Sequence, residues 1–166
     1  MNKEIKIANG QGFWGDSIDA PYNLVKYGEI DYLTLDYLAE VTLSIMQRQK
    51  LKNSDRGYAT DFIDLMKRVM LEIKKKNIKI ITNAGGVNPE VCKNKLLDLA
   101  KTLNINIKVT IIKGDDILDK LEDLISKGVS FENMDDSSDF KLIKEKVYSA
   151  NAYIDSFSIA EALETG

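Results

Sequence analysis

Residues 5–16, IKIANGQGFWGD, begin with a short apolar run that predicts a β-strand and continue into a loop rich in glycine. Gly10, Gly12 and Gly15 all lie in this loop, and glycine lets a backbone turn tightly and approach another group closely. The only tryptophan of the chain, Trp14, stands in the same loop, although loops usually lie on the surface. This combination indicates more than a connector, and we expect function to reside in loops of this kind.

The order of strand, loop and helix recurs along the chain. Apolar runs predict further strands at residues 32–35, 79–82, 107–112 and 147–154. Apolar residues at helical spacing predict helices at about residues 21–27, 38–51, 62–76, 89–103, 116–127, 140–146 and 159–163, with Asp19, Thr60 or Asp61, and Asn88 as expected N-caps. This order predicts an α/β fold, a mostly parallel sheet flanked by helices. A Rossmann-like three-layer sandwich and part of a β/α barrel both fit, and the helix lengths favour the sandwich.

The length and charge of the chain limit what it can be. A chain of 166 residues fits one α/β domain over residues 1–166, with the acidic stretch 129–146 as a variable excursion. A net charge of −3 gives no basic field, so we expect binding neither to nucleic acid nor to a membrane. No apolar run reaches the length of a signal peptide's core or a spanning helix, so we expect a cytoplasmic protein.

Two residue types that often carry catalysis are scarce. The chain has no histidine and one cysteine, Cys92, which excludes an internal disulfide and a cysteine-rich zinc site and removes the commonest general base. Any metal would be held by carboxylates, which favours a divalent cation such as Mg²⁺, Mn²⁺ or Ca²⁺. The glycine spacing in GQGFWG does not match the dinucleotide fingerprint, so we expect neither NAD nor flavin.

Loops that leave the carboxyl ends of parallel strands converge on one edge of a sheet, where ligands bind. The candidate catalytic residues on that edge are Asp16, Asp36 and Asp115, as general acid–base groups or ligands of a divalent ion. The candidate ligand-binding residues are Asn9, Gly10, Gly12, Trp14, Glu40, Asp61, Asn83, Gly85, Gly86 and Asn88. Without histidine, a carboxylate needs burial to raise its pKa toward neutrality, so at least one should be poorly solvated.

Several of these residues also have purely structural interpretations. Consecutive amides at Gly85 and Gly86, before a helix N-terminus, could hold an anion or a developing oxyanion, while the glycines of the first loop could simply make a tight turn. Asp61 could serve only as a helix cap, and Trp14 could plug the sheet edge. Cys92, on a helix face, is expected in the core.

Five motifs occur in one order along the chain: GQGFWGD at 10–16, DYLTLDYLAEVTLSIMQRQ at 31–49, GYATDF at 57–62, TNAGGVNP at 82–89 and GDD at 114–116. Together they resemble the N-terminal domain of the acyclic terpene utilization proteins, the AtuA family, with a further similar segment at 149–163. The family's chains run on well beyond this point, so the resemblance implies a fragment, a split gene or a shortened relative.

The resemblance also implies a function. The family is associated with breakdown of acyclic terpenes such as citronellol and geraniol, a pathway run on coenzyme A thioesters. We therefore expect a catabolic enzyme domain acting on an acyl-CoA or related carboxylate, as a lyase or hydratase-like component.

Two other functions remain open. A non-catalytic binding or subunit domain, completed by a partner chain, predicts an exposed apolar patch around Tyr153, Phe157 and Ile159 and assembly as a homo-oligomer or with a partner subunit. A nucleotide or phosphate-binding module is permitted by the GQG loop, but strand ends poor in lysine and arginine do not favour it.

Overall fold

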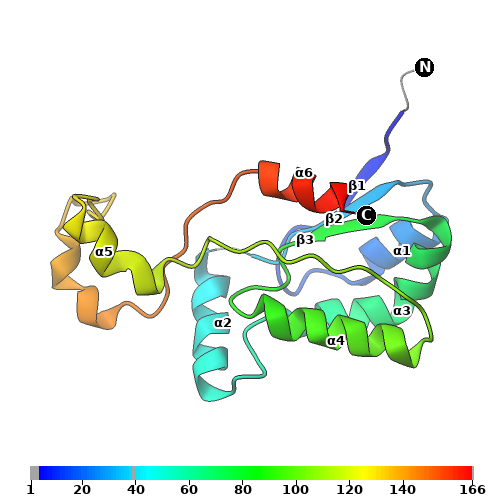
Figure 1. The fold of residues 1–166 in the computed structure, drawn as a ribbon, viewed down its shortest axis with the longest axis horizontal. Coiled ribbons are helices and arrows are strands. Elements are labelled where there is room, and N and C mark those ends of the chain that lie inside the picture. Colours follow the sequence, from blue (N-terminus) through cyan, green and yellow to red (C-terminus); the bar gives the residue numbers. More distant parts are fainter. Residues whose placement is uncertain (1–3, 39, 166) are drawn as a thin grey trace.

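A single parallel sheet organises the chain in the computed structural model, which describes residues 4–38 and 40–165. Its three strands lie in the order β1 (Ile7–Gln11), β2 (Tyr32–Leu35) and β3 (Lys79–Thr82), as Figure 1 shows. In the register, Leu33 of β2 lies opposite Ala8 of β1 and Ile80 of β3. The predicted α/β class, a parallel sheet flanked by helices as in a Rossmann-like sandwich, is confirmed. β2 and β3 have the predicted bounds, whereas β1 begins later and includes Asn9 and Gly10.

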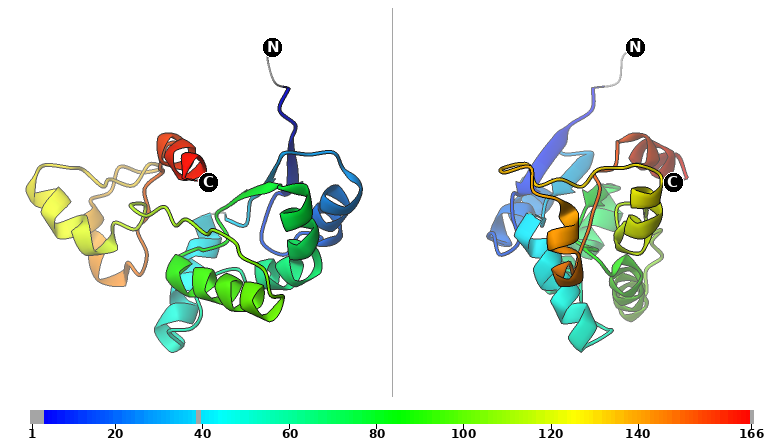
Figure 2. Two further views of the ribbon diagram at one scale, coloured as in Figure 1. Left: turned by 45° about the vertical axis from the view of Figure 1, so that its right-hand side comes forward. Right: turned by 90° about the vertical axis from the view of Figure 1, so that its left-hand side faces the viewer.

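The helices lie mainly on one side of this sheet. They are α1 (Asp19–Tyr27), α2 (Glu40–Lys52), α3 (Thr60–Lys76), α4 (Pro89–Thr102), α5 (Leu121–Ser126) and α6 (Phe157–Glu164). Helices α1, α3 and α4 pack side by side against one face, while α6 lies on the other side of β3 (Figures 1 and 2). No helix in the described part of the chain has the length and apolar character needed to cross a bilayer.

Helix α3 forms the centre of the core because its apolar residues fall on one stripe. Phe62, Leu65, Met66, Val69 and Met70 are buried, as the helical spacing predicts. Each such side chain contributes about 1.5–3 kcal/mol when removed from water. The helix ends at a left-handed asparagine, and the next amide donates back to the last turn. The sheet face presented to this stripe includes Leu33 and Leu35, both buried.

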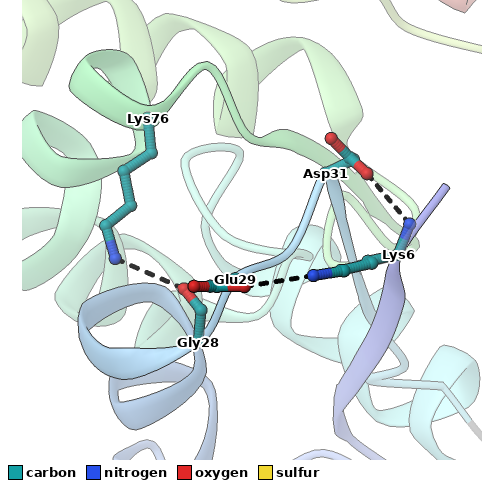
Figure 3. Close-up of polar contacts among 5 residues, drawn as sticks. All are labelled: Lys6, Gly28, Glu29, Asp31 and Lys76. Carbon is teal, nitrogen blue, oxygen red and sulfur yellow. Dashed lines mark hydrogen bonds and ion pairs between the residues drawn. The ribbon is translucent and has the colours of Figure 1, made fainter. Parts of the chain in front are cut away.

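Polar contacts fix the amino-terminal edge of the sheet (Figure 3). The Lys6 amide donates to Asp31 Oδ2 at 2.9 Å, and Lys6 Nζ lies 3.1 Å from Glu29 Oε2. Lys76 Nζ, at the end of α3, donates to carbonyls at the end of α1, including Gly28 O at 3.4 Å. A lysine placed there satisfies helix C-terminal carbonyls and complements the helix dipole.

The predicted strands at residues 107–112 and 147–154 are wrong, because neither forms a ladder in the described chain. Residues 107–112 run beside the sheet without pairing to β3, although their exposure alternates as in a strand. The second segment makes only one antiparallel bridge, between Asp116 and Asn151. A β-branched run favours extended backbone, but a strand also needs a neighbour within hydrogen-bonding distance, and these segments lack one here.

Helix starts also differ from the sequence prediction. Asp19 lies inside α1 rather than capping it, and α3 has Ala59 as N-cap. Asn88 makes no side-chain cap to α4, because its Nδ2 donates to Ser54 O and Arg56 O instead. The predicted helix at 116–127 is a 3₁₀ turn, Leu118–Lys120, followed by α5, and the helix at 140–146 is two 3₁₀ turns, Phe140–Leu142 and Lys144–Lys146. Short, exposed apolar runs in this region have too little to pack against.

Replacing Gly86 by alanine should destabilise the fold. Gly86 has φ of +50°, and an added Cβ would lie 2.8 Å from Gly57 O and against Met46 Sδ. Backbone strain and overpacking together should cost about 2–4 kcal/mol. Gly128→Ala is the matched control, because Gly128 also has positive φ, +87°, but open space around it, and it should lose only about 1 kcal/mol. Urea unfolding of the two variants measures this difference, and equal losses would contradict the packing argument.

Candidate functional site

A groove of about 1920 Å³ opens at the free edge of β3. Its walls come from β3, the segment 106–116 and α6. The predicted site residues that line it are Asn9, Asp36, Asn83, Gly85, Gly86, Asn88 and Asp115. The groove is larger than the roughly 300–1,000 Å³ of an ordinary small-molecule pocket. It can therefore hold more than one small ligand.

The polar end of the groove is organised by Asn83, which follows β3. Its Nδ2 donates to Asp36 Oδ1 at 2.7 Å, and its Oδ1 accepts the Tyr37 amide at 2.7 Å. The Leu38 amide also donates to Asp36 Oδ1, at 3.0 Å. One side chain thus joins the carboxyl ends of β2 and β3. Asp36 itself is exposed, so its carboxylate can meet a ligand.

Asp115 forms a second polar point of the groove. Its Oδ2 accepts a hydrogen bond from Asn151 Nδ2 at 3.0 Å, and its carbonyl accepts the Ala152 amide at 2.7 Å. These contacts join the segment after α4 to the segment before α6. Asn151 lies in the segment 147–154, which forms no strand in the described chain, so it reaches Asp115 from an irregular segment.

In the glycine turn after β3, most backbone amides already donate hydrogen bonds to groups of the protein. The Gly86 amide donates to Asn83 O at 3.0 Å, and the Val87 amide donates to Gly57 O at 3.0 Å. The Asn88 amide donates to Gly85 O, and the Ala84 amide donates to Thr82 Oγ1. An anion bound by the Gly86 amide would first have to displace one of these bonds. The turn is therefore fixed by its own bonds and by packing against α2.

The first loop forms a separate cluster whose residues do not line the groove. Asp16 accepts the Gly12 amide at 3.1 Å and the Ser17 amide at 2.7 Å, so it holds the loop closed. Trp14 Nε1 donates to Asp61 Oδ1 at 2.9 Å, which joins this loop to the start of α3. The lining of the groove thus includes none of Asp16, Gly12, Trp14 and Asp61. The loop still adjoins the site, because the Asp36 amide donates to Gln11 O at 3.1 Å.

Gly10 and Glu40 complete the list of predicted site residues. A Cβ on Gly10 would lie 2.8 Å from Pro21 Cβ and 3.1 Å from Leu33 Cδ1, so this glycine permits close packing of α1 on the sheet. It is buried and lies outside the groove lining. The side chain of Glu40 lies outside the described residues.

The expectation that a candidate carboxylate would be buried is wrong. Asp36 is exposed, and Asp16 and Asp115 are only partly covered. Each of the three accepts hydrogen bonds from nearby groups, which hold it at the surface. Across residues 4–38 and 40–165, no three acidic or cysteine side chains gather where they could hold a metal ion.

Sequence reasoning missed Tyr37, which lies beneath the Asp36–Asn83 pair. It is fully buried and packs edge-to-face on Phe62, with ring centroids 5.8 Å apart. Burial raises the pKa of the Tyr37 hydroxyl above its ordinary value, and the Asp61 charge adds to the rise. The hydroxyl has no hydrogen-bond partner among the described residues. The only sequence signal was its position directly after the strand and the candidate aspartate.

The matched family agrees with the motifs found in the sequence. A family model described as acyclic terpene utilisation family protein AtuA matches residues 5–166. The chain belongs to the AtuA family. The predicted resemblance is therefore confirmed, and AtuA membership suggests a role in acyclic terpene utilisation. No curated protein and no solved structure matches the chain.

Trp14 should report on the contact between the first loop and α3. Asp61→Ala leaves the partly buried indole N–H without its acceptor, which should shift Trp14 emission to longer wavelength and destabilise the fold by about 1–2 kcal/mol. Asp64→Ala on the same helix removes only an exposed ion pair with Lys67 and should change neither quantity appreciably. Fluorescence during urea unfolding measures both. An unchanged emission maximum in Asp61→Ala would contradict the contact.

Cys92 should be unreactive in the folded AtuA chain. Burial on α4 raises the pKa of its thiol to about 12, so almost no thiolate forms near neutral pH. Between pH 7 and pH 9, labelling by a thiol-specific disulfide reagent should follow the rate of unfolding, and Cys92→Ala should remove the signal. Rapid stoichiometric labelling of the native protein would show that the thiol is accessible.

Proposed function

We propose that this AtuA chain binds an acyl-CoA or related carboxylate of acyclic terpene breakdown in the groove beside β3. The observation that carries the proposal is the division of the groove into a polar end and an apolar wall. Asp36 and Asn83 lie at the polar end, with Asp115 also in the lining. The apolar wall includes Ile107, Val109, Ile111, Ile159 and Leu163. A methyl-branched acyl chain with one polar head group has the same division.

The charges around the groove support a thioester of coenzyme A over a free alcohol. Lysines in the lining are Lys50, Lys74, Lys79, Lys93, Lys108, Lys113 and Lys120. Some are engaged, since Lys113 pairs with Glu90, Lys50 Nζ donates to Val87 O at 2.7 Å and Lys108 Nζ donates to Thr165 O at 2.9 Å. The others offer ammonium groups for the phosphates of coenzyme A. A free terpene alcohol has no group that would use them.

For the reaction, we assign Asp36 as the general base and Asp115 as the group that binds or protonates the substrate. Asp36 is assigned as the base because it lines the groove and Asn83 fixes its orientation. A bound acyl chain would exclude water from this exposed carboxylate, which is the desolvation that a carboxylate base needs. The step it would catalyse is removal of the proton on the carbon next to the thioester carbonyl, with the electron pair passing to the carbonyl oxygen. Asp16 is assigned to the first loop instead, because its two oxygens hold Gly12 and Ser17.

Binding is tested by a thermal-shift titration with coenzyme A, the CoA thioester derived from citronellol, and the corresponding free acid. A ligand at a hundredfold excess over its Kd should raise Tm by about 5–10 °C. The branched thioester should give a larger shift than coenzyme A, because only the thioester fills the apolar wall. Val109→Glu should remove that difference. Equal shifts for the two ligands would place the acyl chain outside the groove.

Chemistry is tested by exchange of the thioester's α-proton with D₂O, followed by mass spectrometry. Asp36→Asn should lower the exchange rate by roughly 10²–10⁴-fold, the usual contribution of a general base. Asp16→Asn is the matched control, with the same chemical change outside the groove, and should exchange at the parent rate. Loss of exchange in Asp16→Asn but not in Asp36→Asn would reverse the assignment.

A second candidate function, a non-catalytic subunit domain completed by a partner, is favoured by exposed aromatic groups beside the groove. Tyr153 is 98% exposed and Phe157 is 77% exposed. Ile159 is partly covered. Side chains of this size are usually packed, and aromatic residues are enriched in protein interfaces. In this case the thioester would bind weakly or not at all until the partner is present.

A further inference from the structure

Two rows of backbone groups without partners face the groove. One row is the outer edge of β3, which ends the sheet. The other is the strap, which we define as residues 106–115. Among the described residues, the only backbone hydrogen bond made by the strap is at its end, where Asp115 O accepts the Ala152 amide. Such rows are templates for pairing with another strand.

The strap already has the side-chain arrangement of a strand in this sheet. Ile107 and Val109 are partly buried and pack against the core, whereas Lys108 and Thr110 are exposed. Just before the strap, the Ile105 amide donates to Ala100 O at 3.0 Å, and Asp115 anchors its other end. The strap is therefore held in place alongside β3 (Figure 1). Residues of both β3 and the strap line the groove.

We propose that the groove accepts an extended strand of a partner polypeptide, inserted between β3 and the strap and hydrogen-bonded to both. Neighbouring strands lie about 4.8 Å apart, so a strand inserted to pair with both rows requires about 9.6 Å between β3 and the strap. This inference deepens the second candidate function by naming its surface, and it does not require that the chain bind thioesters.

A second copy of this chain is a poor occupant. An inserted strand must be free on both edges, but β1 and β3 each have one edge paired and β2 has both paired. The strap of a second copy is anchored at both ends. Pairing between β1 of one copy and β3 of the next would leave the strap unpaired and would continue without closure. No strand of a second copy that the structure describes is therefore suited to the groove, and the occupant that we propose is a segment of a different polypeptide.

The walls of the groove indicate the composition of that segment. Lys79 of β3 is on the sheet face opposite Ile80, and Lys108 of the strap is on the exposed side. Neither lysine pairs with a carboxylate among the described residues, and Lys108 Nζ donates only to Thr165 O at 2.9 Å. Core-facing neighbours are Ile107 and Val109. The matching strand alternates β-branched residues toward the core with acidic residues toward the lysines.

A strand in this position would also reach the site. β3 leads to Asn83 and the strap leads to Asp115, so the end of an inserted strand lies between these two residues. The partner can then supply a side chain to the polar end of the groove. This placement gives a chain without histidine a route to a further functional group.

The test uses a short capped peptide that alternates valine with glutamate, measured by calorimetry on the whole chain. The control peptide has the same side chains but is N-methylated at alternate residues, which removes backbone donors on one edge. The parent peptide should bind, and the methylated one should bind at least about tenfold more weakly, the effect of one lost hydrogen bond. Lys79→Glu should also weaken the parent peptide. Equal binding of the two peptides, or no binding of either, overturns the proposal.

Two variants of the strap test its direct role. Successive residues in a strand point their amides to opposite edges, so Val109→Pro and Thr110→Pro each remove an amide, only one of which faces the groove. One variant should weaken the peptide about tenfold, and the other should not. Circular dichroism and Tm establish that both remain folded. Equal effects in the two folded variants overturn the pairing with the strap.

The alternative to an inserted strand is that the strap itself pairs directly with β3. In a Cys92→Ala background, Ile81→Cys and Thr110→Cys together would form a disulfide if the strap pairs directly with β3, because adjacent strands place Cα atoms within bonding reach. With a strand position left between them, the cysteines are about 9.6 Å apart and stay reduced. Efficient disulfide formation in the peptide-free protein overturns the proposal. Self-association that the peptide does not reverse would assign the groove to a second copy and overturn it too.

Discussion

The side chain of Asn83 is the contact on which the candidate site depends. It bonds to Asp36 and to the Tyr37 amide, and so fixes the ends of two neighbouring strands at one point. In a parallel sheet, hydrogen bonds pair the strands along their length, but the residues just after each strand belong to loops and are more mobile. Here the side-chain amide of Asn83 fixes the positions of those residues. The fully buried Tyr37 ring below gives that point a rigid base.

The core explains why one half of the chain is regular and the other is not. Up to the end of α4, most helices and strands have an apolar face and another element to cover it, as with α3 against α1 and α4. Helix α2 is the exception, since Val41 and Leu51 on it are exposed. Beyond α4, Ile107 and Val109 still pack against the core, but the chain between Asp116 and Asn151 forms a small lobe at the far end of the molecule from α1 (Figure 1). In this lobe Phe131 and Phe140 pack on each other, with ring centroids 5.7 Å apart. Local propensity yields turns and short helices there, and tertiary packing does not extend them.

This difference also explains what the sequence could predict. β2 and β3 were predicted to the residue because each is a short run of apolar and β-branched residues, and Leu33 and Leu35 of β2 are buried. Residues 107–112 are also a run of apolar and β-branched residues, but they form no strand in the described chain. A strand needs a neighbouring strand to pair with, and the pattern of one segment does not show whether that neighbour is in place. For the site, convergence of strand ends placed Asp36 with Asn83. It also grouped Asp16 with them, whereas the groove lining leaves Asp16 out and its hydrogen bonds lie within the first loop.

The lobe between Asp116 and Asn151 has a consequence for how such chains can change. These two residues form a bridge, and Ile117 also donates to Ala150 O at 2.9 Å, so the lobe leaves and returns at one place. A segment whose ends are adjacent can be lengthened, shortened or exchanged at little cost to the rest of the chain, since loop closure depends only weakly on length. This part of the molecule is therefore free to diverge among relatives while the sheet and the groove keep their geometry.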